Sequence, residues 1–62
     1  MTDTEKLDKA MGLTAELWNI IVSIENKHPM DEKETCTDIH NIQNRILSIA
    51  YRGNLKLKTK LR

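Results

Sequence analysis

The sequence predicts an all-α fold: an antiparallel hairpin of two helices that self-associates into a helical bundle, with a basic C-terminal tail. Apolar residues recur at helical spacing in both halves, and a single proline, Pro29, separates them. A chain of 62 residues also buries too little surface to be more than marginally stable alone. Because Cys36 is the only cysteine and no standard zinc spacing occurs, we expect no cofactor or metal and assign the missing stability to oligomerisation.

The first helix is predicted over residues 4–26, with Asp3 or Thr4 as its N-terminal cap. Gly12 weakens its middle by about 1 kcal/mol relative to alanine. Its apolar residues cover nearly half of its circumference, which is more than one partner helix covers, so pairing of two hairpins is expected. The self-interface predicted on this helix consists of Leu17, Trp18, Ile21 and Ile24.

A turn is predicted over residues 27–31, because Pro29 disfavours the helical conformation of the residue before it. The second helix is predicted over residues 32–52, with Asp31 and Glu34 at capping-box spacing and Gly53 as its C-terminal stop. The short turn makes the two helices antiparallel neighbours within a hairpin domain of residues 1–53. Its predicted self-interface is a seam spaced by three, four and three residues: Ile39, Ile42, Ile46 and Ile49.

Polar residues flank this isoleucine seam, among them His40, Gln43 and Asn44. Such residues specify the register of helices in a bundle, or they line a ligand pocket between helices. A further polar row, Asp38, Asn41, Arg45 and Arg52, is either a solvated face or a surface that recognises an anionic group.

Charge is divided unequally along the chain. All nine acidic residues lie at or before Asp38, and the six basic residues after it have no acidic neighbour. In the tail, residues 54–62, leucines and basic residues alternate with the period of a half-buried strand. The tail is expected to be disordered or ordered by a partner, such as nucleic-acid phosphates or the edge of a sheet. The residues predicted to bind a partner or ligand are Asn41, Arg45, Tyr51, Arg52, Lys56, Lys58, Lys60 and Arg62.

Catalysis and membrane insertion are not expected. Cys36 and His40 lie four residues apart on one helix, but a two-helix hairpin offers little of the pocket and oxyanion hole that a nucleophile needs. The longest apolar run has three residues, far fewer than the roughly 20 of a membrane span, and the N-terminus lacks the apolar run of a signal peptide. We therefore expect a non-enzymatic protein of the cytoplasm.

Residues 15–52 resemble a group of short phage and prophage proteins. The shared residues are Leu17 and Trp18, then His28, Pro29, Asp31 and Glu34, then Asp38, Ile39, His40, Ile42, Gln43, Asn44, Ile46 and Arg52. The resemblance implies phage or prophage origin and the cytoplasm of a bacterial host. A second likeness, to helical-hairpin sponges that sequester cyclic-nucleotide immune signals, rests on the proline turn, the acidic helix start and the late arginine, although the alanine- and tryptophan-rich second helix of that group is absent.

Three functions follow as hypotheses. The first is a small accessory protein that oligomerises and binds a host or phage macromolecule, in host takeover or counter-defence. The second is a nucleic-acid-binding regulator that uses the basic C-terminal end, and the third is a sponge for a cyclic nucleotide.

Overall fold

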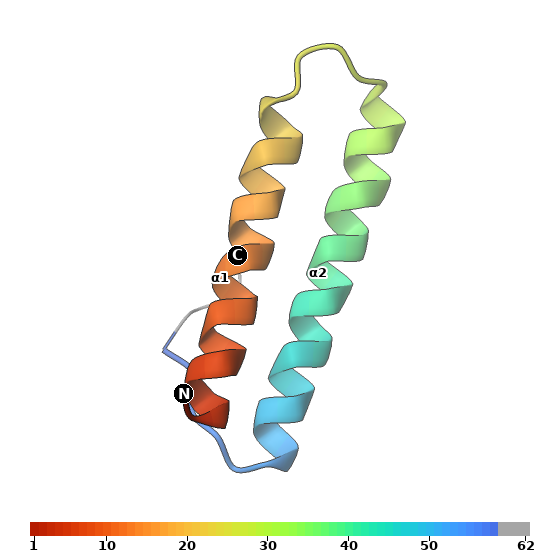
Figure 1. Cartoon of the computed structure of the whole chain (residues 1–62). Coiled ribbons are helices and arrows are strands. Elements are labelled where there is room, and N and C mark those ends of the chain that lie inside the picture. The colour runs from red at the N-terminus through yellow and green to blue at the C-terminus, as the bar shows by residue number, and fades with distance from the viewer. Residues whose placement is uncertain (59–62) are drawn as a thin grey trace.

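The computed structural model describes residues 1–58, which form two helices, α1 (Asp3–Ser23) and α2 (Pro29–Arg52). The helices lie side by side and antiparallel, and the link between them is at one end of the molecule (Figure 1). The predicted all-α hairpin is therefore confirmed. The predicted boundaries change: α1 ends at Ser23 instead of residue 26, and α2 begins at Pro29 instead of residue 32.

Each helix begins at a cap other than the predicted one. Thr2, not Asp3 or Thr4, caps α1 in a capping box, in which the Thr2 hydroxyl accepts from the Glu5 N–H at 3.2 Å. His28, not Asp31, caps α2, and its Nδ1 accepts from the Met30 N–H at 3.1 Å. Pro29 then occupies the first helical position, where its fixed φ suits a helix and its missing N–H costs no bond.

Lys27 holds the connection between the helices. Its ammonium group donates to the carbonyl oxygen of Val22 at 3.2 Å and to that of Ile24, the residue that caps the C-terminus of α1. It also lies 3.6 Å from the carboxylate of Glu32 in the first turn of α2. A loop lysine thus supplies the positive charge that the last turn of α1 lacks, and it links the two helix ends.

The first part of the tail folds back onto the hairpin. The segment after α2 crosses the end of the molecule towards α1 (Figure 1), and the Lys58 N–H donates to the Asp8 carboxylate at 2.8 Å. Leu55 and Leu57 are half-buried while Lys56 and Lys58 are exposed, so the predicted alternation is observed, although residues 54–58 form no strand. The remaining tail residues, including Lys60 and Arg62, lie outside the described residues.

Candidate functional site

The interior of the hairpin is small and contains a polar layer. Its buried apolar side chains among residues 1–58 are Met11, Ile39, Ile46 and Ala50. Between them lies Gln43, fully buried, whose amide nitrogen donates to the Thr14 hydroxyl at 2.9 Å. The Thr14 hydroxyl in turn donates to the Met11 carbonyl oxygen at 2.6 Å, but the Gln43 amide oxygen has no hydrogen-bond partner. The Gln43–Thr14 bond fixes which residues of the two helices lie opposite each other.

The predicted isoleucine seam is split by this arrangement. Ile39 and Ile46 face α1 and are buried, so they belong to the contact within the chain instead of a surface for another molecule. Ile42 and Ile49 face outward and are about half exposed. The residues of α2 that face α1 are spaced by four, three and four residues: Ile39, Gln43, Ile46 and Ala50.

Five of the exposed large apolar residues lie on one side of the hairpin. Leu17, Ile42 and Ile49 each come directly before a residue that faces the other helix. Each therefore points about 100° away from the direction of the other helix, and always with the same sense of rotation about its own helix axis. In antiparallel helices, the same rotation leads to the same side of the pair. Leu13 and Ile20 extend this surface around α1. We call these residues the apolar face: Leu13, Leu17, Ile20, Ile42 and Ile49, with exposed fractions of 54%, 45%, 60%, 48% and 55%.

The other predicted interface residues lie beside this surface. Trp18 and Ile21 are partly buried between the helices, and Ile24, at the end of α1, is 43% exposed. The interface predicted from the sequence does not include Leu13 and Ile20. Their spacing of four and three residues from Leu17 could have indicated that they share its side of the helix.

The opposite side of the hairpin is more polar, although Val22, which directly follows Ile21, is 46% exposed there. There the residues that directly follow inward positions are exposed or half-exposed, among them Gly12, Asn19, His40 and Asn44. The tail lies over this side, because the Lys58 N–H donates to the carboxylate of Asp8, which directly follows the half-buried Leu7. Tyr51, 85% exposed, projects from the same side near the C-terminal end of α2. The hairpin thus has an apolar face and a polar side that carries the described lysines of the tail.

A charged row borders the apolar face along α2. It consists of Asp31, Asp38, Arg45 and Arg52, each seven residues from the next. All four are exposed, and none has an ion pair or side-chain hydrogen bond within residues 1–58. Arg45 and Arg52 flank an open hollow of about 400 Å³ that Ser48 and Ile49 complete. Asn41 is exposed one step further around the helix.

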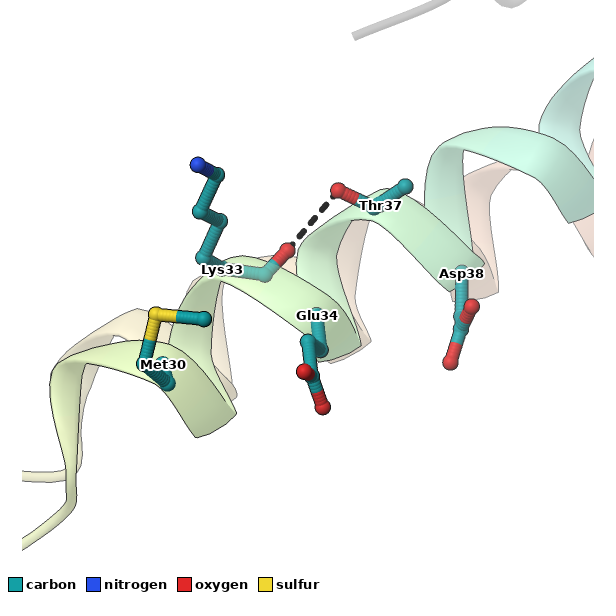
Figure 2. A pocket seen from close by; sticks show the side chains of 5 residues that line it. All are labelled: Met30, Lys33, Glu34, Thr37 and Asp38. Atoms are coloured by element: carbon teal, nitrogen blue, oxygen red, sulfur yellow. Dashed lines mark hydrogen bonds between the residues drawn. The ribbon is translucent and has the colours of Figure 1, made fainter.

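A second hollow, of about 280 Å³, lies on the first turns of α2 (Figure 2). Met30, Lys33, Glu34, Thr37 and Asp38 line it. The Thr37 hydroxyl donates to the Lys33 carbonyl oxygen at 2.8 Å, while the carboxylates of Glu34 and Asp38 extend together away from Lys33 (Figure 2). Within residues 1–58, no three His, Cys, Asp or Glu side chains are placed to hold a metal ion.

No family model, no curated protein and no solved structure matches this chain. Across residues 1–58, neither helix combines the length and apolar character that crossing a membrane requires. The resemblance to phage and prophage proteins therefore stays a prediction.

Proposed function

We propose that this chain is a small non-catalytic interaction protein that self-associates and binds a host or phage macromolecule. One observation carries the proposal: the apolar face and the described lysines of the tail lie on different sides of one hairpin. A chain of this size gains stability by covering exposed Leu and Ile side chains with another chain. If the apolar face is covered in this way, the C-terminal end of the polar side stays free for a second contact.

The surface proposed for the macromolecule consists of Tyr51, Lys56 and Lys58. An exposed aromatic ring and basic side chains on the same side of a protein are a combination that partner surfaces use, because the ring supplies contact area and the ammonium groups supply charge. The phage resemblance and the lone Cys36 add the cytoplasm of a bacterial host as the setting, with host takeover or counter-defence as the role.

The test is in-cell photocrosslinking. A photoreactive residue at position 51 should give a discrete crosslinked product with one macromolecule, because this ring is free on the polar side. The matched control places the same residue at Asn19, which is also exposed on the polar side but lies at the other end of the hairpin. Equal products from both positions, or none from position 51, would contradict the proposed surface.

The exposure of Tyr51 beside Arg52 also favours nucleic acid as the macromolecule. Bases stack on exposed aromatic rings, with about 1–3 kcal/mol lost per base when the ring is removed. Titration of labelled single-stranded DNA should then show an affinity that falls steeply as the salt concentration rises. The Tyr51→Ser variant should bind more weakly, and the double variant Lys56→Gln, Lys58→Gln should show a smaller dependence of affinity on salt. Salt-independent affinity would exclude this candidate.

The cyclic-nucleotide sponge draws less support. Its phosphates would meet Arg45 and Arg52, but the hollow between them is open. Ligand pockets bury about 70–90% of a small ligand, and an open hollow on one helix leaves most of a nucleotide in water.

A further inference from the structure

The apolar face needs an occupant, and the charges beside it indicate which one. The row Asp31, Asp38, Arg45 and Arg52 is acidic near the turn and basic near the C-terminus of α2. The midpoint of this row lies between Asn41 and Ile42. Asp38 and Arg45 are equally distant from it along the chain, and so are Asp31 and Arg52. Such a row is complementary to its own copy when the copy runs in the opposite direction.

We propose that a second copy of this chain covers the apolar face, with the two α2 helices antiparallel across a two-fold axis near Ile42. Asp38 of each copy then faces Arg45 of the other, and Asp31 faces Arg52. The arrangement rests on the self-association in the proposed function and specifies its geometry. In a two-fold interface, the same patch of both copies is used, so each charge pair occurs twice.

The apolar residues fit the same axis. The Ile42 side chains of the two copies meet near the axis. In each copy, Ile49 lies towards one end of the hairpin from the axis and Leu17 lies towards the other end, and all three residues belong to the apolar face. The two α1 helices also become antiparallel neighbours, which completes a four-helix bundle. A standard interface of about 800 Å² per partner would take roughly a sixth of the 4945 Å² surface.

The alternative pairings fit less well. If α1 of the second copy lay over α2, the charged row would face Leu13 and Ile20 with one acidic residue, Glu16, between them, which would leave most of the row's charges against an apolar surface. If the two α2 helices ran parallel, Asp31 and Asp38 would face their own copies, and like charges would repel. Only the antiparallel pairing gives these four side chains the ion-pair partners that residues 1–58 of their own chain do not provide.

Charge reversal tests this geometry. Asp38→Arg alone and Arg45→Asp alone should each weaken the homodimer by about tenfold, because each turns two attractive pairs into two repulsive ones. The double variant restores opposite charges and should dimerise like the wild type. A mixture of the two single variants should form heterodimers in preference to either homodimer, which native mass spectrometry resolves by mass.

Two control variants carry the same charge changes outside the apolar face. Glu25→Arg in the link between the helices matches Asp38→Arg, and Lys33→Asp on α2 matches Arg45→Asp, and both positions are exposed. The controls should dimerise like the wild type. If they weaken the dimer as much as the row variants do, or if mixing brings no preference for heterodimers, the antiparallel pairing is overturned.

A crosslink gives a second, independent readout. In the Arg52→Lys variant, a zero-length carbodiimide should join the introduced amine to the carboxylate of Asp31. Within one chain, positions 31 and 52 are separated by roughly 30 Å of helix, so this product forms only between copies. A dimer that yields other amide links but not this one would overturn the pairing while leaving self-association intact. A monomeric wild type would overturn both, and the Tyr51 crosslink would still test macromolecule binding separately.

Discussion

Asn54 is the residue at which the backbone leaves α2. Its φ of 56° is left-handed, whereas Gly53 before it has φ −90° and ψ 4°. The Leu55 N–H donates to the Ala50 carbonyl at 2.8 Å, and the Asn54 N–H donates to the Tyr51 carbonyl at 3.2 Å. These two bonds form a Schellman motif in which asparagine takes the position where glycine is usual. Gly53 therefore marks the end of the helix as predicted, but it is not the residue that needs conformational freedom.

This geometry predicts opposite results at two adjacent residues. Asn54→Ala should lower the free energy of unfolding by about 1 kcal/mol, because alanine tolerates the left-handed conformation poorly. Gly53→Ala should be nearly neutral, since its added Cβ would lie 3.4 Å from the Ile49 carbonyl and 3.5 Å from Leu55, which is ordinary contact. Thermal unfolding followed by circular dichroism measures both. A larger loss at Gly53 than at Asn54 would contradict the assignment.

Gly12 offers a second residue-scale prediction. A Cβ added there would meet nothing within 4 Å, and its φ is not positive. Gly12→Ala should therefore raise the free energy of unfolding by about 1 kcal/mol through helix propensity alone. Because Gly12 lies on the polar side, the variant should leave the oligomeric state unchanged in light scattering. A loss of stability or of assembly would mean that another chain packs on this side.

At the scale of the elements, Gln43 is the feature that joins α1 to α2. Its amide oxygen is buried without a hydrogen bond, a state that costs about 1–3 kcal/mol, while its amide nitrogen bonds Thr14 of the other helix. The polar layer therefore weakens the hairpin while it selects one register. We interpret Gln43 as a register device of the kind expected from the sequence beside the seam.

Replacing Gln43 with leucine should separate these two roles. Gln43→Leu should raise the free energy of unfolding by about 1 kcal/mol, since the unpaired oxygen is removed and Thr14 keeps its bond to Met11. Denaturant unfolding measures the gain, and native mass spectra should show a wider range of assemblies than the wild type. If stability falls, the amide oxygen has a partner in the assembled protein.

At the scale of the whole molecule, the proposed self-association would link stability to assembly. The buried apolar core within residues 1–58 is small, while five large apolar residues on one side stay about half exposed. A dimer that folds as it assembles has an unfolding midpoint that depends on protein concentration. The midpoint of this protein should therefore rise with concentration.

Ile42→Lys should abolish that concentration dependence, because it places a charge near the proposed two-fold axis. The matched control, Asn44→Lys, adds the same charge to an exposed position on the polar side and should preserve the dependence. Differential scanning calorimetry at several concentrations distinguishes the two variants. A midpoint that is independent of concentration in the wild type would contradict self-association.

Much of the fold was accessible from the sequence, but the surfaces were less so. Helical spacing and Pro29 predicted two helices with a tight turn, and both are observed. The caps were not predicted, because threonine at position 2 and histidine before a proline are weaker signals than the aspartates nearby. The binding residues predicted from charge are exposed where the structure describes them, but Asp31 and Asp38 join Arg45 and Arg52 in one row, which the seven-residue spacing could have indicated.

The helices, the position of the turn and the separation of acidic from basic residues follow from the sequence, because these depend on neighbours along the chain. The side of each helix that faces inward was decided by tertiary packing. Ile42 and Ile49 are seven residues apart, and so are Gln43 and Ala50, so the seven-residue repeat alone does not choose between the two rows. The choice depends on Thr14 of the other helix, whose hydroxyl accepts the Gln43 amide and so leaves both isoleucines outside.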